Sequence, residues 1–133
     1  MDPKRLREIP FFASLGKREL EQVGAWTDEV ELPAGRVLGR EGSMAYEFFV
    51  IEDGAVEVTL DGEHLTDLGA GDFFGEIGLL ESERRTATVT TTTPVRVIVM
   101  FGRDFRHMER EMPQVAQQIR EAIEVRLGRR PDS

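Results

Sequence analysis

The chain has 133 residues, of which 40% are hydrophobic and 32% charged, and this composition fits one compact globular domain rather than a disordered chain. The formal net charge of −8 argues against DNA or RNA binding by this domain alone, because a phosphate backbone is held by clustered Lys and Arg. The absence of cysteine excludes disulfides, thiolate metal sites and cysteine nucleophiles. The sequence shows neither a signal-peptide hydrophobic region nor the roughly 20 consecutive apolar residues that span a bilayer, so we expect a cytoplasmic protein without membrane contacts.

Residues 1–26 are expected to form short N-terminal helices. Pro10 ends the first helix, because proline cannot continue a helical hydrogen-bond ladder. The second helix is predicted to start at Ser14 as N-cap and to end near Gly24, with Leu20 and Val23 on one face.

Residues 27–101 follow the two-residue alternation of β-strands. The stretch EVELPAGRVLGREG predicts a strand, a turn and a second strand. Asp53-Gly54 and Asp61-Gly62 stand between apolar runs and each predicts a β-hairpin. Two more strands, bent at Pro94, follow in RTATVTTTTPVRVIVM. Seven or eight short strands argue for an all-β barrel or sandwich of jelly-roll type, and we expect a mainly β fold, an eight-stranded jelly-roll β-barrel with flanking helices.

Residues 102–128 return to a helical pattern. Pro113 separates a short helix from a longer one, and the longer one carries an apolar stripe at helical spacing: Val115, Ala116, Ile119, Ala122, Ile123 and Leu127. The stripe suits packing on the barrel, and it would also suit a homodimer seam. One domain is therefore expected over residues 1–133.

The sequence GDFFGEIGLLESERRTATV, residues 71–89, combines glycines and core-type side chains with an isolated acid and an arginine. Gly75 to Leu80 suits one helical turn, whose free N–H groups would favour a phosphate or a carboxylate. Gly75 and Gly78 would let a ligand approach the backbone. Arg85 offers two donors to phosphate oxygens, which makes this stretch the candidate site.

Three further side chains complete this candidate site. Thr86 adds a hydroxyl donor beside the arginine, and Ala87 is small enough to leave space. Glu76 cannot bind an anion, so it would accept hydrogen bonds from a sugar hydroxyl. Taken singly, a glutamate in a first helical turn usually compensates the helix dipole, and an arginine at a strand start is usually a solvated surface charge. Together they match a ligand that carries both a phosphate and a ribose.

Phe74 to Leu80, followed by Arg85 to Val89, resemble the phosphate-binding cassette of cyclic-nucleotide-binding domains, the type found in catabolite activator protein and kinase regulatory subunits. The segments IPFFASLGKREL, LPAGRVLGREG and FFVIEDGAVEV are also similar to this family, so the resemblance covers nearly the whole chain. It implies a cassette over residues 74–89 in a barrel over residues 27–101, with the family's B and C helices over residues 102–128.

The resemblance also implies roles for individual residues. Glu76 would hydrogen-bond the ribose 2′-hydroxyl, and Arg85 would pair with the exocyclic oxygens of the cyclic phosphate. The rest of the phosphate cradle would come from the following residues: Phe74, Gly75, Ile77, Gly78, Thr86 and Ala87.

Two features of the sequence depart from the family pattern. Arg84 stands where many members have proline, and Thr86 stands where many have alanine. A hydroxyl at position 86 is associated with cGMP in the kinase branch, but bacterial cAMP binders also carry one. We therefore expect cAMP, with cGMP as the alternative, and expect Arg84 to be a solvated neighbour. The base-capping residue is not identified, although Arg129 or Arg130 could stack on the base.

The resemblance implies a regulatory domain rather than an enzyme, with a cyclic nucleotide as ligand and no cofactor or metal. Ligand capture would shift a population of states through the B and C helices toward an effector protein or domain that the sequence does not name.

Two other functions were weighed against this one. A cupin-like enzyme needs several His and carboxylates around one metal, whereas His64 and His107 stand in segments with no reason to meet and are expected at the surface. A degenerate domain could keep the fold only as a protein-interaction or dimerisation module. The intact Glu76 and Arg85 argue against this second alternative.

Overall fold

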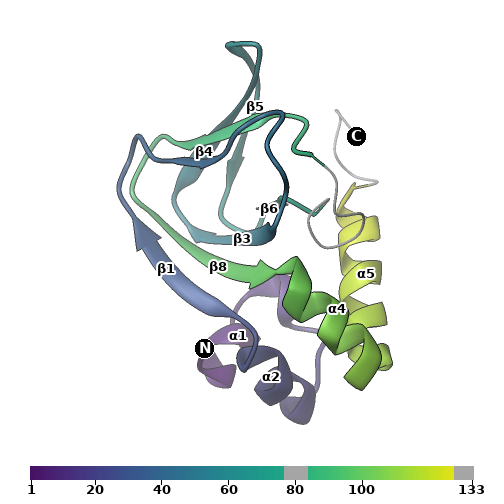
Figure 1. Cartoon of the computed structure of the whole chain (residues 1–133). Helices are drawn as coiled ribbons and strands as arrows, with labels where there is room; N and C mark the ends of the chain where they lie inside the picture. Colours follow the sequence, from purple (N-terminus) through teal and green to yellow (C-terminus); the bar gives the residue numbers. More distant parts are fainter. Residues whose placement is uncertain (77–83, 128–133) are drawn as a thin grey trace.

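The computed structural model describes residues 1–76 and 84–127, with backbone only for Arg126 and Leu127. Within these residues, eight strands form two four-stranded antiparallel sheets, and the helices gather at one end (Figure 1). The strands are β1 (Asp28–Leu32), β2 (Val37–Gly39), β3 (Glu47–Asp53), β4 (Ala55–Leu60), β5 (Glu63–Gly69), β6 (Phe73–Phe74), β7 (Thr88–Thr91) and β8 (Val95–Phe101). The helices are α1 (Pro3–Arg7), η1 (Pro10–Phe12), α2 (Lys17–Gly24), α4 (Gly102–Glu111) and α5 (Pro113–Leu127).

The two sheets have the strand orders β1-β8-β3-β6 and β2-β7-β4-β5. Most connections between the described strands therefore carry the chain from one sheet to the other, and among these strands only β4 and β5 are both consecutive and hydrogen-bonded to each other. The alternation is that of a jelly roll, so the prediction of a mainly β jelly-roll fold with flanking helices is confirmed.

The two Asp-Gly pairs have different structures. At Asp61-Gly62 both φ angles are positive, 52° and 81°, and Leu60 pairs with Glu63, so the predicted hairpin is confirmed. The hairpin predicted at Asp53-Gly54 is wrong, because β3 pairs with β6 and β8 whereas β4 pairs with β5 and β7. Gly54 has a φ of +96°, and a Cβ there would lie 2.3 Å from the carbonyl oxygen of Pro94. This glycine permits a crossing between sheets rather than a hairpin turn.

The N-terminal helices are shorter than the sequence pattern indicated. Helix α1 is capped by Asp2, whose side chain accepts a 2.9 Å hydrogen bond from the Lys4 N–H, and Pro10 opens the 3₁₀ helix η1. The prediction of Ser14 as the N-cap of α2 is wrong, since the N-cap is Gly16. The Gly16 N–H donates to the Glu19 carboxylate at 3.1 Å, so a side chain inside the helix supplies the cap.

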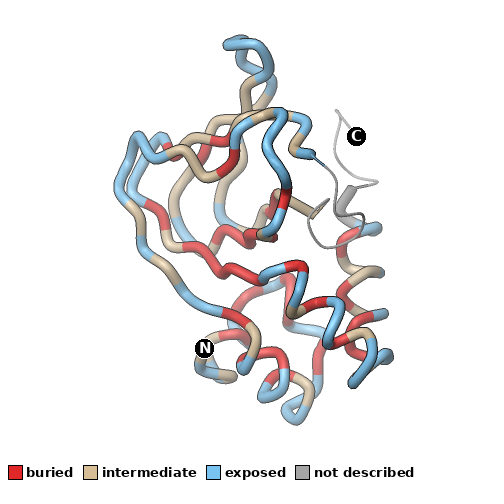
Figure 2. The backbone as a smooth tube through the Cα atoms, in the orientation of Figure 1, coloured by how far each residue is buried: buried red, intermediate tan, exposed pale blue. Residues whose placement is uncertain are grey.

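The apolar stripe of α5 packs inside its own chain. Val115, Ala116, Ile119 and Ile123 are buried in one cluster with side chains of α1, η1, α2, α4 and the helix-facing side of the β1-β8-β3-β6 sheet. Figure 2 shows the buried positions along the inner sides of these helices. The described part of the stripe is therefore covered within its own chain and gives no support for a dimer seam, while the side chain of Leu127 lies outside the described residues.

A second apolar cluster fills the space between the two sheets. Its buried members are Phe49, Ile51, Val56, Phe74, Val89, Val95, Val97 and Val99. Strand β3 serves both clusters, because successive side chains point to opposite faces of a strand: Phe48 and Val50 face the helices, and Phe49 and Ile51 face the other sheet.

An ion-pair network joins α1 to the sheet. Arg5 contacts the carboxylate of Glu29 on β1 at 2.8 Å and also that of Glu52 on β3. Arg96 on β8 adds contacts to Glu52 at 3.9 Å and to Glu31 at 3.4 Å. The two carboxylates raise the pKa of Arg5, so this cation is neutralised by its own protein.

None of the described helices is both long and apolar enough to cross a bilayer.

Candidate functional site

The first predicted site residues lie at the end of β6, against β3. Phe74 pairs with Phe49 across the sheet, and their rings stack with centroids 4.7 Å apart and an interplanar angle of 17°. Gly75 follows with a φ of +81°, and Glu76 lies next in a turn and is partly buried. Ile77, Gly78 and the helical turn predicted to Leu80 lie outside the described residues.

Gly75 lies directly against the backbone of β3. A Cβ at this position would be 2.5 Å from the carbonyl oxygen of Glu47 and 3.1 Å from Nη1 of Arg85. A side chain here would therefore displace a backbone carbonyl, and the positive φ excludes most residues as well. The cassette glycine and the cassette arginine, ten positions apart in sequence, meet at this point.

Backbone hydrogen bonds fix the position of Arg85. Its N–H donates to the carbonyl of Ser43 at 2.7 Å, and its own carbonyl accepts from the N–H of Gly42 at 2.8 Å. The side chain then crosses β2 at Gly39, where a Cβ would be 2.7 Å from Cδ and 2.8 Å from Nε. Gly39 leaves the space through which the arginine stem passes.

The guanidinium of Arg85 is held by a carbonyl and an aromatic ring. Nη2 donates to the carbonyl of Glu47 at 3.3 Å, and Cζ lies 6.0 Å from the centroid of the Phe49 ring. Among the described residues no carboxylate oxygen comes within ion-pair distance of this guanidinium. Burial lowers the pKa of Arg85, while the more distant charges of Glu47 and Glu76 act to raise it. Within residues 1–76 and 84–127, the site therefore contains a partly desolvated cation with no carboxylate bonded to it.

The remaining cassette residues lie beside this cation. Ala87 is partly buried, whereas Thr86 is exposed. Arg84 is also exposed, and its Nη1 donates to the carbonyl of Gly42 at 2.8 Å, in keeping with its expected role as a solvated neighbour. The structure thus brings Gly75, Glu76 and Arg85 into one neighbourhood. Arg129 and Arg130 lie outside the described residues.

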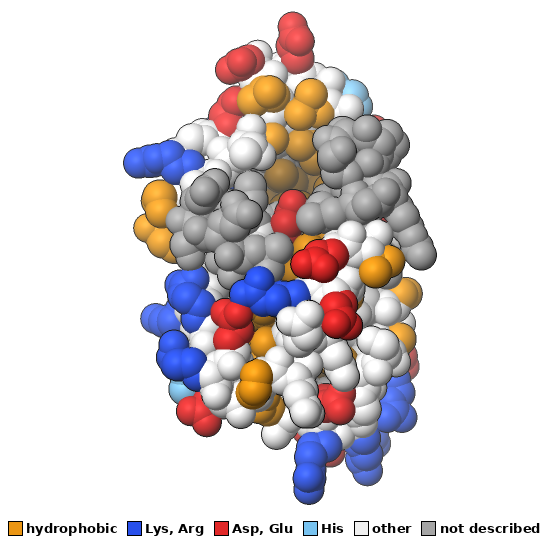
Figure 3. All heavy atoms as spheres, turned by 90° about the vertical axis from the view of Figure 1, so that its right-hand side faces the viewer, with side chains coloured by type: hydrophobic (Ala, Val, Ile, Leu, Met, Phe, Trp, Pro, Cys, Tyr) orange, Lys and Arg blue, Asp and Glu red, His pale blue; other side chains and the backbone are white. Residues whose placement is uncertain are grey.

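The face of the molecule that carries α5 is shown in Figure 3. In its upper half, hydrophobic side chains gather in a hollow, with acidic side chains at the top of the view.

Three residues that hold Arg85 were not expected from the sequence. Gly39, Glu47 and Phe49 come from β2 and β3, some forty positions before the arginine. The sequence did contain one signal, since a glycine inside a strand often marks close approach by another group. The carbonyl of Glu47 could not be found from side-chain patterns, because its role belongs to the backbone.

The two histidines occupy different elements, as expected. His107 on α4 is exposed and meets the ring of Trp26 edge-on, with centroids 5.5 Å apart. His64 on β5 is exposed and lies beside Glu57 and Asp67. The two do not share a site, as a cupin-type metal centre would require.

Comparisons with known proteins agree with this geometry. The family model for the cyclic nucleotide-binding domain matches residues 29–111. A cyclic nucleotide-gated potassium channel of Rhizobium etli is 33% identical over 123 residues, which cover 92% of this chain and 34% of the channel. A cAMP-dependent protein kinase regulatory subunit of Emericella nidulans is 34% identical over 101 residues, which cover 74% of this chain and 24% of the subunit.

Solved structures give the same result. A protein of Geobacter metallireducens has a TM-score of 0.84 and 27% identity, with 94% of each chain covered. The N-terminal domain of a transcriptional regulator from Streptomyces coelicolor has a TM-score of 0.75 and 29% identity, with 96% of this chain and 92% of that domain covered. The chain spans about a third or less of the length of the channel and the kinase subunit, so the resemblance concerns one domain of each. On the match over residues 29–111, the chain belongs to the cyclic nucleotide-binding domain family.

Proposed function

We propose that this chain is a regulatory domain that binds cAMP in the cassette at residues 74–89. The observation that carries the proposal is Arg85, a partly desolvated guanidinium that is held by the Glu47 carbonyl and the Phe49 ring and has no bonded carboxylate among the residues that the structure describes. Keeping a cation out of water without a counterion costs free energy, and a ligand phosphate would offset that cost. No reaction is assigned to the site.

The other cassette groups would bind different parts of the ligand. Glu76, on the turn after Gly75, would accept a hydrogen bond from the ribose 2′-hydroxyl. Thr86 is exposed beside Arg85, where its hydroxyl could reach either a phosphate oxygen or the base. This position would decide between cAMP and cGMP, and we propose cAMP as the preferred ligand. A kinase regulatory subunit named for cAMP is among the relatives, which supports that order.

We further propose that binding is transmitted through α4 and α5. Glu109 on α4 forms an ion pair with Arg120 on α5, and the Arg120 guanidinium lies 5.4 Å from the Phe105 ring centroid. This contact gives the helix pair a defined arrangement that ligand binding could favour or disfavour. A coupling of about 1–3 kcal/mol between ligand and helices would be typical of such a domain. The recipient would be an effector protein or domain, and a cytoplasmic location remains the prediction.

Calorimetric titration with cAMP and cGMP tests the proposed site. We expect wild type to bind cAMP more tightly than cGMP, and Arg85→Ala to lose about 10- to 150-fold in affinity, the equivalent of one charged hydrogen bond. Glu76→Gln should weaken binding less, because the amide oxygen still accepts a hydrogen bond. Arg84→Ala is the matched control, since Arg84 is the neighbouring residue and its exposed side chain carries the same charge.

Equal affinity of wild type and Arg85→Ala for cAMP would show that the cassette does not hold the phosphate. Absence of binding by wild type to either nucleotide would instead favour the alternative, a domain that keeps this fold as an interaction module. Tighter binding of cGMP would reverse the proposed preference and assign Thr86 to the base.

A further inference from the structure

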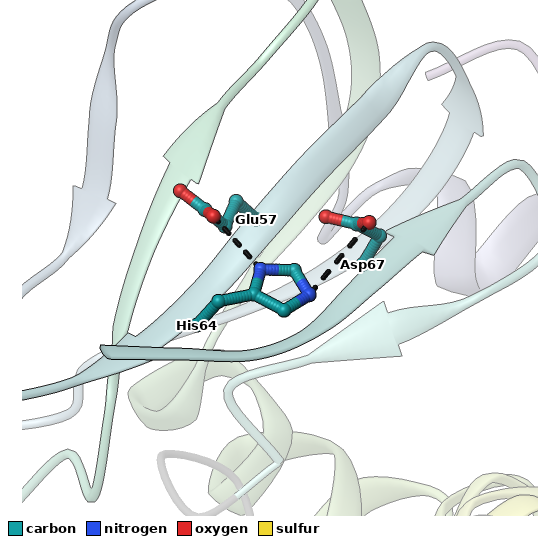
Figure 4. A group of neighbouring side chains, drawn as sticks. All are labelled: Glu57, His64 and Asp67. Atoms are coloured by element: carbon teal, nitrogen blue, oxygen red, sulfur yellow. Dashed lines mark hydrogen bonds and ion pairs between the residues drawn. The ribbon is translucent and has the colours of Figure 1, made fainter. Parts of the chain in front are cut away.

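The outer face of the β4–β5 hairpin brings together three side chains of the types that bind metal ions. Figure 4 shows the imidazole of His64 between the carboxylates of Glu57 and Asp67. One ligand atom from each residue lies within 4.8 Å of those of the other two. The cluster belongs to β4 and β5 and includes none of the cassette residues 74–89.

The strand register places the two carboxylates against each other. Glu57 pairs directly with Asp67 across the antiparallel hairpin. Like charges at directly opposed positions destabilise a strand pair, unless a cation lies between them. A group that can carry or bind positive charge at this point of the outer face would offset that repulsion.

A β-bulge turns His64 toward this position. Val58 pairs with Thr66, but the next pair is Thr59 with His64, so Leu65 is an extra residue on β5. In a regular strand His64 and Asp67, three positions apart, would point to opposite faces. The bulge returns the imidazole to the face of Glu57 and Asp67, a way in which bulges commonly re-aim a side chain.

The distances from the two ring nitrogens of His64 indicate different roles for Glu57 and Asp67. Nδ1 of His64 lies 2.8 Å from Oε2 of Glu57. An ionised carboxylate only accepts hydrogen bonds, so Nδ1–H donates a hydrogen bond to Glu57 and Nε2 presents its lone pair. Nε2 lies 3.9 Å from Oδ2 of Asp67. Two ligand atoms that each lie about 2.0–2.2 Å from one metal ion are about 3.4 Å apart at a tetrahedral angle and about 4 Å apart when they lie on opposite sides of it. The distance between Nε2 and Oδ2 falls within this range.

We propose that Nε2 of His64 and the Asp67 carboxylate bind one divalent transition-metal ion of the zinc class. Glu57 is a positioning residue, which fixes the imidazole through Nδ1 as carboxylates do behind many metal-bound histidines. The three side chains keep 50%, 38% and 69% of their surface exposed (His64, Glu57 and Asp67), so water can supply the remaining ligands. An imidazole ligand favours Zn²⁺, Ni²⁺ or Cu²⁺ over Mg²⁺ or Ca²⁺.

Titration of the tag-free full chain with Zn²⁺ tests the site, followed by NMR of the imidazole nitrogens. The chain contains two histidines, so the His107→Gln variant assigns the signals. We expect a saturable change with one-to-one stoichiometry at Nε2 of His64, no change at His107, and no response to Mg²⁺ at the same concentration. A response of both histidines alike, or an equal response to Mg²⁺, would overturn the proposal.

Three variants separate ligand, positioning and general charge effects. His64→Gln should abolish the calorimetric Zn²⁺ binding, whereas Glu57→Gln should weaken it by about 10- to 100-fold, as loss of an outer-shell carboxylate does. Glu63→Gln removes one negative charge from the same hairpin and should leave binding unchanged. Unchanged Zn²⁺ affinity in His64→Gln, or an equal loss in Glu63→Gln, would contradict the site. None of these outcomes depends on cyclic-nucleotide binding.

Discussion

Two arginines of this fold have opposite surroundings and opposite pKa shifts. Arg5 lies between the carboxylates of Glu29 and Glu52, which raise its pKa. Arg85 is partly buried against Phe49 and donates to the backbone carbonyl of Glu47, and burial lowers its pKa. The first cation is neutralised by carboxylates of the fold, whereas the second has no bonded carboxylate among the described residues. The side chains are identical, so their surroundings alone distinguish the structural ion pair from the proposed binding site.

The sharpest test exchanges each arginine for methionine, which keeps an apolar stem and removes the charge. Arg85→Met should lose cAMP affinity by at least about 10- to 150-fold, the loss of a charged hydrogen bond. Its melting temperature without ligand should not fall, because a desolvated cation is removed. Arg5→Met should show the reverse, with a lower melting temperature and unchanged affinity. Calorimetry and thermal unfolding measure both, and a parallel response of the two variants would contradict the contrast.

The second prediction concerns the passage of Arg85 across β2. Gly39→Ala places a methyl group 2.7 Å from Cδ of Arg85 and should move the guanidinium rather than the backbone, because the arginine stem is flexible. We expect cAMP affinity to fall by about 10- to 100-fold with little change in stability, since a displacement of about 1 Å at a binding group is costly. Gly69→Ala is the control, because the nearest atom to a Cβ there is 3.8 Å away. Equal affinity of the two variants would show that Gly39 does not position Arg85.

The third prediction separates strain from charge at the same site. Gly75→Ala introduces a side chain at a φ of +81° and 2.5 Å from the carbonyl oxygen of Glu47. We expect the free energy of unfolding to decrease by more than about 1 kcal/mol, because alanine does not tolerate this conformation. Urea unfolding without ligand measures the effect. Wild-type stability would mean that the chain does not need this close approach.

The smallest expected effect lies in the Arg5 network and depends on pH. Burial raises the pKa of Glu52, and the hydrogen bond and charge of Glu29 add to this; the hydrogen bond from Glu52 in turn lowers the pKa of Glu29. Above the ordinary range of a glutamate the native state therefore keeps a proton on Glu52 that the unfolded state has lost. The Glu52 contribution to stability thus falls as pH rises from the ordinary pKa through the raised one.

Glu52→Gln removes this titration but keeps a hydrogen-bond donor toward Glu29. Relative to wild type, the variant should gain stability as pH increases from the ordinary pKa of a glutamate, about 4.3, through the raised pKa of Glu52, and the difference should level off at the acid end. Urea unfolding across this range measures the difference. A constant difference would show that Glu52 titrates normally in the folded protein.

The sequence pattern predicted the element types well and the strand partners less well. Period-two alternation identified the strands, and the stripe from Val115 to Ile123 identified the buried face of α5. The Asp53-Gly54 turn was misread because a local sequence specifies a turn without specifying which sheet the next strand joins. Register between distant strands depends on packing, and no local signal encodes it.

The candidate site divides in the same way. Arg85, Gly75 and Glu76 could be chosen from their residue types and spacing, and the structure places them near one another. The support for Arg85 could not be predicted, because it comes from a glycine and a backbone carbonyl on strands β2 and β3. The β4–β5 bulge was not predicted either, and the proximity of His64 to Asp67, which depends on it, was therefore not expected.

The pairing of β1 with β8 has a consequence for how the chain folds. Asp28 lies opposite Val99 in the finished sheet, so the edge strand must wait for a partner some seventy residues later. Closing so long a loop is entropically costly before its contacts form, and such non-local topologies fold slowly. During synthesis β1 therefore emerges from the ribosome unpaired. Helices α1, η1 and α2 also reach their final packing late, because the buried cluster that contains them includes side chains of β8, α4 and α5.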